Sequence, residues 1–192
     1  LGNLDYLIES GATVSLGSAV LSNTTGTLTV RGNLQVGSPH PGGAIQLVNQ
    51  GNLHISGERI FESGSTLEYN GVAAQCIGEG HPATPTVNLI CSNPSGITLL
   101  KAVVVGDLDV VSDVNTQTFP ITIGGDFSVA PGANFNPQDI ILVGGEEQYI
   151  TATGILLRDL IVNKSSDDVH LAEDMRISRA LTIESSNTLF HS

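Results

Sequence analysis

The sequence predicts an all-β fold, a right-handed parallel β-helix (β-solenoid) of about nine coils. Short stretches alternate between apolar and polar residues, as at 27–30 and 121–123, which is the pattern of a half-buried strand. Clusters of Gly, Asn, Ser and Pro separate these stretches, and such clusters are typical of turns. No window shows the sustained i, i+3, i+4 apolar spacing of a helix.

The strongest evidence for a solenoid is a five-residue phrase that recurs. It consists of a glycine, then Asn or Asp, then two apolar residues two positions apart, and it occurs at 32–36, 51–55, 106–110 and 125–129. The first two copies are 19 residues apart, and so are the last two. A short fixed period indicates turns of chain that stack on one another. We therefore expect Asn33 beside Asn52, and Asp107 beside Asp126, about 4.8 Å apart.

Two further repeats support stacking. A second phrase places a turn glycine between apolar residues at 8–14, 61–67 and 129–135. A longer likeness relates 70–77 to 143–150, and 88–109 to 159–182, which suggests a module of about 73 residues holding three to four coils. A pair of β-sandwiches, the alternative fold, has no reason to repeat at these intervals. The right hand follows the general preference of parallel crossovers.

Composition narrows the classes of function. The net charge is −12, from 19 acidic and 7 basic residues, which argues against nucleic acid or an anionic membrane as partner. Trp is absent and aromatics are 4%, so Val, Ile and Leu must form the core. No apolar run approaches the roughly 18 residues of a membrane span. The chain begins with Leu, and we interpret 1–192 as a single solenoid segment of a longer protein.

Two runs, at 61–78 and 160–171, resemble the β-helical repeats of large secreted surface proteins from bacteria with type IX secretion. The resemblance extends over most of the chain and is best over 43–192. It implies an extracellular, cell-surface location and a stalk, scaffold or adhesin-like role. It implies no catalytic residues.

The phrase also supplies the candidate metal ligands, Asp107, Asp109 and Asp126, with Asp113 nearby in sequence. Adjacent carboxylates repel one another, so a proton or a cation must lie between them. Ca²⁺ takes six to eight oxygen ligands, and this group with backbone carbonyls could supply them. The favoured interpretation is instead a ladder of capped turns, because Asn and Asp bond readily to turn backbone. We expect no other cofactor.

The cysteines and histidines carry weaker predictions. We expect Cys76 to face outward and Cys91 inward, and hence two free thiols rather than a disulfide. We expect solvated loop or strand positions for all five histidines: His40, His54, His81, His170 and His191. Two loops, at 37–43 and 78–85, interrupt the repeat and contain His-Pro. Such insertions are either tolerated surface loops or binding loops.

Two functions remain. The preferred one is a non-catalytic structural or adhesive segment of a secreted bacterial cell-surface protein or filament. The alternative is a carbohydrate-binding or polysaccharide-degrading β-helix module. A β-helix lyase would need a basic residue beside its acidic metal cluster, and only Lys101 lies within a few residues of 107–113. The sequence shows no amphipathic cap at 1–4 or 188–192, so we expect neighbouring coils or chains to continue the stack.

Overall fold

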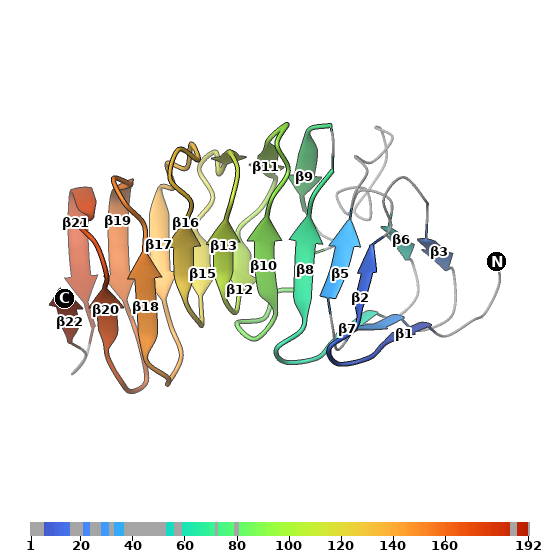
Figure 1. The fold of residues 1–192 in the computed structure, drawn as a ribbon. Helices are drawn as coiled ribbons and strands as arrows, with labels where there is room; N and C mark the ends of the chain where they lie inside the picture. The colour runs from blue at the N-terminus through green and yellow to red at the C-terminus, as the bar shows by residue number, and fades with distance from the viewer. Residues whose placement is uncertain are drawn as a thin grey trace.

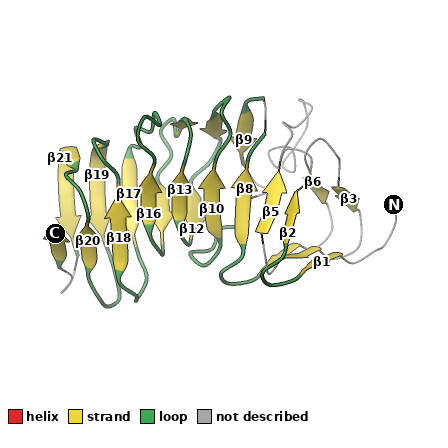
Figure 2. Ribbon diagram, viewed as in Figure 1, coloured by secondary structure: helices red, strands yellow, loops and turns green. Residues whose placement is uncertain are grey.

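In the computed structural model, every ladder that joins two strands is parallel. The structure describes residues 6–15, 21–23, 28–30, 33–36, 53–55, 59–71, 73–78, 81–184 and 188–191. These residues contain strands, turns and no helix (Figure 2). Parallel pairing of strands from successive coils confirms the β-solenoid and excludes the β-sandwich alternative, whose sheets would be antiparallel.

The longest sheet runs from one end of the rod to the other (Figure 1). Its nine strands, in spatial and chain order, are β2 (Thr13–Ser15), β5 (Asn33–Val36), β8 (Thr66–Tyr69), β10 (Asn88–Cys91), β13 (Leu108–Val110), β16 (Phe127–Val129), β18 (Gln148–Thr151), β20 (Val169–Leu171) and β22 (Leu189–His191).

Shorter sheets complete the coils. A five-stranded sheet lies behind the C-terminal part of the long sheet (Figure 1) and contains β12 (Val103–Val105), β15 (Ile121–Ile123), β17 (Asp139–Leu142), β19 (Leu156–Val162) and β21 (Arg176–Ile183). A three-stranded sheet contains β9 (Gln75–Ile77), β11 (Ile97–Leu99) and β14 (Val114–Asn115). Towards the N-terminus, β1 (Tyr6–Ile8), β4 (Leu28–Val30) and β7 (Arg59–Phe61) form one sheet, and β3 (Leu21–Asn23) and β6 (Leu53–Ile55) another.

The register of the long sheet gives the number of turns. From β8 onward the positions in line with Leu67 are Leu89, Leu108, Phe127, Ile150, Leu171 and His191. From Leu67 to His191 the solenoid therefore makes about six turns, whereas about nine coils were expected for the whole chain. In this row, only the two steps from Leu89 to Phe127 are as short as 19 residues. The other steps in this row are longer.

Of the two expected 19-residue contacts, the one at 107 and 126 is confirmed, and the other involves Asn52, which lies outside the described residues. Leu108 lies beside Phe127, as the phrase predicted. Asn33, however, pairs with Thr13 on one side and with Thr66 on the other. The strand of the second phrase, β6, pairs instead with β3. Between β5 and β8 in the sequence lie β6 and β7, which belong to other sheets, so equal spacing in sequence does not become adjacency in space.

Inward-facing Val, Ile, Leu and Phe side chains form one continuous core along the rod. In the long sheet, the buried rows contain the two apolar residues of the phrase, as in Leu108 with Val110 and Phe127 with Val129. The facing sheet contributes Ile140, Leu160 and Val162. This confirms the alternation on which the strand predictions rested. Each coil leaves its apolar face open until the next coil covers it, so stability depends on stacking.

The 73-residue likeness is real in sequence but does not describe a structural module. Its two copies of Gln-x-apolar fall in different sheets, at β9 and β18. Both glutamines are buried, and each accepts a hydrogen bond from a side chain that lies later in the sequence. Asn93 Nδ2 donates to Gln75 Oε1 at 2.8 Å, and Lys164 Nζ donates to Gln148 Oε1 at 3.1 Å. The likeness therefore reports a shared way of satisfying a buried amide rather than a repeated set of coils.

The glycines of the second phrase do turn the chain. Gly64 and Gly132 have φ values of +79° and +90°, and Gly11 has +76°. This left-handed region is open to glycine and costly for most other residues. The prediction of a turn at these positions is confirmed.

Candidate functional site

The polar residue of the phrase caps the next coil along the rod. Asp107 Oδ1 accepts from the backbone N–H of Asp126 at 2.9 Å. Asn88 Oδ1 does the same for the N–H of Asp107, and Asp126 Oδ1 for that of Tyr149. The expected capping ladder is therefore present, but each cap joins two coils instead of closing its own turn. Each backbone N–H donates to a negatively charged oxygen, and such charge-assisted hydrogen bonds stabilise the ionised carboxylates of Asp107 and Asp126.

The same contact explains the glycine before each Asp. A Cβ built on Gly106 would lie 2.5 Å from Asn88 Oδ1, and one built on Gly125 would overlap Asp107 Oδ1. Neither Gly106 nor Gly125 has a positive φ. The glycine is needed because the carboxylate or amide of the preceding coil approaches the backbone closely.

The predicted metal ligands are only partly brought together. Asp107 and Asp126 lie in one outward row, whereas Asp109 lies in the adjacent row and accepts from Ser128 Oγ. Asp113 lies in a different cavity, described below. Across the described part of the chain, no three His, Cys, Asp or Glu side chains are grouped so that they could hold a metal. A Ca²⁺ ion at Asp107 and Asp126 would compete with the caps, and its binding there stays a prediction.

The row of caps continues towards β22 as a row of stacked rings, which sequence reasoning missed. Tyr149 stacks on His170 with ring centroids 4.9 Å apart, and His170 stacks on Phe190 at 5.4 Å. The interplanar angles are 16° and 15°, so neighbouring rings cover both faces of His170. The row stabilises adjacent strands, and it leaves little ring face free for a flat ligand.

One histidine prediction is wrong. His81 is buried, with only 3% of its surface exposed, and neither ring nitrogen has a hydrogen-bond partner among the described residues. Burial, with a contribution from the charge of Lys101, lowers the pKa of His81 to about 3. Its loop, 81–85, reaches the next coils, because the Pro85 carbonyl oxygen lies against Gly124. The loop at 37–43 lies outside the described residues.

Both cysteine thiols are free, as expected. Cys91 is fully buried in the core row, and Cys76 is half-buried. Burial raises the pKa of the Cys91 thiol to about 12, so this thiol is unreactive at neutral pH.

Three adjoining cavities of about 350, 120 and 330 Å³ form a groove on the described surface. Asn136 lines all three, and Leu156 lines the second and third. Hydroxyl and amide side chains are concentrated in the first cavity, whereas apolar residues and glycine line most of the second. The first and third cavities contribute Ser95, Thr98, Asp113, Asn115, Thr116, Gln117, Asn134, Gln138, Arg158 and Ser178.

The first cavity lies where β11, β14 and Phe135 follow one another in successive coils. Its side chains are held by bonds to the backbone. Asp113 Oδ1 accepts from Asn134 N at 2.8 Å, and Asn115 Oδ1 accepts from Gln117 N at 2.9 Å. Asn136 Nδ2 donates to Asn134 Oδ1 at 2.8 Å. These bonds fix the orientation of amides whose remaining donors and acceptors are available to a ligand.

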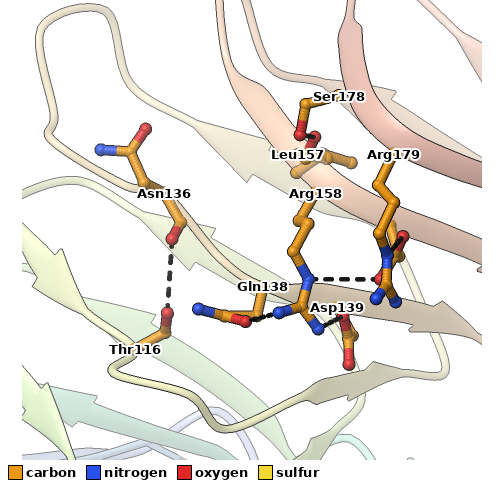
Figure 3. A network of polar contacts seen from close by, with 9 residues as sticks. Thr116, Asn136, Gln138, Asp139, Leu157, Arg158, Ser178 and Arg179 are labelled. Carbon is orange, nitrogen blue, oxygen red and sulfur yellow. Dashed lines mark hydrogen bonds and ion pairs between the residues drawn. The ribbon is translucent and has the colours of Figure 1, made fainter.

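A charged network borders the third cavity (Figure 3). Arg158 donates through Nη2 to Asp139 Oδ1 at 2.8 Å, through Nε to Asp159 Oδ2 at 3.3 Å, and through Nη1 to Gln138. Arg179 Nε donates to Asp159 Oδ1 at 2.7 Å, and its Nη2 contacts Asp159 Oδ2. The hydrogen bonds from Arg179 are the main reason why the pKa of Asp159 is lowered to about 2.

We expect Asp159→Asn to lower the melting temperature by several degrees at pH 7, because two arginines lose their shared carboxylate. A lowered carboxyl pKa stabilises the fold above the unfolded value of about 4, and this contribution disappears as the pH falls towards 2. The variant should therefore lose less stability than the wild type between pH 4 and pH 2. Thermal melts across this range test the prediction. Asp167→Asn, at an exposed loop position, is the control and should follow the wild-type curve.

The groove is better suited to binding than to acid catalysis. A glycosidase needs a carboxylic acid that stays protonated near neutral pH. Asp159 is instead held ionised by two arginines, and one oxygen of Asp113 is engaged by the Asn134 backbone. No step of a reaction follows from this arrangement.

No protein family matches the chain, no curated protein matches it in sequence, and no solved structure matches it. The described residues include no helix that is both long and apolar enough to cross a membrane. The fold and its surface define the class: a parallel β-solenoid with a capping ladder on one face and a polar groove made by successive coils.

Proposed function

We propose that this chain is a non-catalytic structural or adhesive segment of a secreted bacterial cell-surface protein or filament. Three features support the proposal: a core built by stacking, a low content of charged residues, and two runs that resemble surface-protein repeats. In this role the solenoid extends a rod, and further coils continue it.

The observation that carries the proposal is the open apolar end at β21 and β22. Leu181 is in line with Leu160, and Ile183 with Val162. The inner residues of these pairs are fully buried, whereas Leu181 and Ile183 are 47% and 42% exposed. Both strands are outermost in their sheets. A further coil would bury these side chains and pair the strand edge.

The proposal predicts that the purified chain associates through this end as its concentration rises. Sedimentation velocity from about 1 to 100 μM, a range centred near the affinity of a weak interface, should show a growing oligomer fraction. The Leu181→Glu/Ile183→Glu double variant should stay monomeric, because charges at inward positions oppose edge pairing. Circular dichroism would confirm that the variant is folded.

Val111→Glu is the matched control, because Val111 is 48% exposed but lies outside β21 and β22. It should associate like the wild type. A wild-type chain that remains monomeric throughout, or a double variant that associates normally, would contradict the open-end proposal.

A further inference from the structure

We propose that the groove centred on Asn136 binds a linear, uncharged polysaccharide, with about one sugar residue per coil. This inference does not depend on continuation of the stack at β21 and β22. It would give the solenoid a ligand as well as a mechanical role. The groove shares no lining residue with the capping ladder of Asn88, Asp107 and Asp126 or with the stacked rings.

The shape of the groove indicates a chain-like ligand. Its lining residues come from consecutive coils, through Ile97, Val114 and the bridge to Phe135, and then through Leu156 and Ser178. Adjacent coils are separated by about 4.8 Å, so the groove is roughly 20 Å long. A pyranose unit is about as long as this spacing. An extended glycan can therefore place equivalent hydroxyls at equivalent positions on successive coils.

The chemistry of the first cavity matches sugar hydroxyls. Hydroxyl and amide groups both donate and accept hydrogen bonds, as sugar hydroxyls do. Within the described residues, Asn115 Nδ2, Asn134 Nδ2 and Asn136 Oδ1 have no protein partner. Their other amide atoms are already fixed, so a ligand would find them oriented in advance. The exposed side chain of Leu156 adds an apolar surface for ring C–H groups.

Charge favours an uncharged ligand. The net charge of −12 opposes a polyanion. Arg158 does not offer a free cation, because Asp139 and Asp159 already pair with it. A nucleic acid would need several unpaired basic residues along its path. An extended peptide would be read through main-chain bonds at a strand edge, but the Val114 N–H already donates to the Asn134 carbonyl.

Isothermal titration with defined oligosaccharides tests the proposal. The probes are uncharged β-1,4-linked glucan, mannan and xylan oligomers of two to six units, with hexagalacturonate as the anionic comparison. At least one uncharged series should bind, with affinity rising with chain length because longer oligomers reach more coils. Asn136→Ala should weaken hexamer binding at least tenfold, since Asn136 borders all three cavities.

Asn163→Ala is the matched control, because Asn163 is exposed and lies outside the three cavities. It should bind like the wild type, and melting curves should show that both variants are folded. The proposal is overturned if no uncharged series binds at millimolar concentration, if only hexagalacturonate binds, or if Asn136→Ala binds as well as the wild type. Each of these results leaves the association test at Leu181 and Ile183 unaffected.

Discussion

Between pH 6.5 and about pH 4.5, the solenoid should lose about 2–3 kcal/mol of unfolding free energy because of His81. His81 is neutral in the folded protein, since burial and the charge of Lys101 lower its pKa from 6.5 to about 3. In the unfolded chain the same imidazole takes up a proton below pH 6.5. The unfolded state therefore binds more protons in this interval, and stability falls as the pH falls.

Urea unfolding at closely spaced pH values measures this loss. The His81→Leu variant should show a nearly flat profile over the same interval. It should be at least as stable as the wild type at pH 7, because two ring nitrogens without described partners are replaced by an apolar side chain of similar size. The prediction thus reverses the usual expectation that a change at a buried residue is destabilising.

His170→Gln is the control at a second histidine, on the surface of the solenoid. His170 lies on the outward face of β20, between Tyr149 and Phe190. The variant should retain the wild-type acid sensitivity. A flat wild-type profile, or an unchanged slope in His81→Leu, would show that the His81 ring is solvated or partnered in solution.

The class of fold could be predicted from the sequence because solenoids repeat local rules. Strand alternation and turn glycines are local features of the sequence. The pairing of Leu108 with Phe127 and the turns at Gly64 and Gly132 therefore follow from the sequence directly. The number of turns and the partner of Asn33 could not be predicted. They depend on how much chain each coil holds, and a phrase repeated at 19 residues does not reveal that β5 pairs with β8 while β6 pairs with β3.

The groove was hidden from sequence reasoning for a related reason. Its uncharged polar lining residues are Asn, Gln, Ser and Thr in short strands and in the segments between them, and these residue types are common on any such surface. They become a site only because coils of unequal length bring Asn115, Asn134 and Asn136 to one side of the rod. His81 was missed because a His-Pro pair in a polar loop is usually solvated, whereas this loop folds against the core. The metal hypothesis rested on the adjacency of Asp107 and Asp126, which is correct. In the structure each of these carboxylates accepts a hydrogen bond from a backbone N–H of the next coil.

Because Gly125 and Asp107 are in contact, we expect the stability costs of substitutions at these two positions to be non-additive. Gly125→Ala should cost about 1–3 kcal/mol, the usual range for overpacking, because the new Cβ overlaps Asp107 Oδ1. Asp107→Ala should cost about 1 kcal/mol through loss of the cap on Asp126 N–H. The combined variant should cost less than the sum of the two single variants, since removal of the carboxylate relieves the overlap and leaves only the contact of the new methyl group with the Asp107 backbone N at 3.1 Å.

Urea unfolding of the wild type, the two single variants and the double variant gives the coupling energy. The double variant should be about 1–2 kcal/mol more stable than the sum of the two single costs predicts. Asp126→Ala is the matched control. It removes the next cap, from Tyr149 N–H, but it makes no room at Gly125, so its cost should add to that of Gly125→Ala. Additive costs for Asp107→Ala and Gly125→Ala would mean that the glycine is required for backbone conformation instead. Coupling would establish that Gly and Asp in the phrase are two halves of one contact between coils, in which each glycine accommodates the cap from the coil before it.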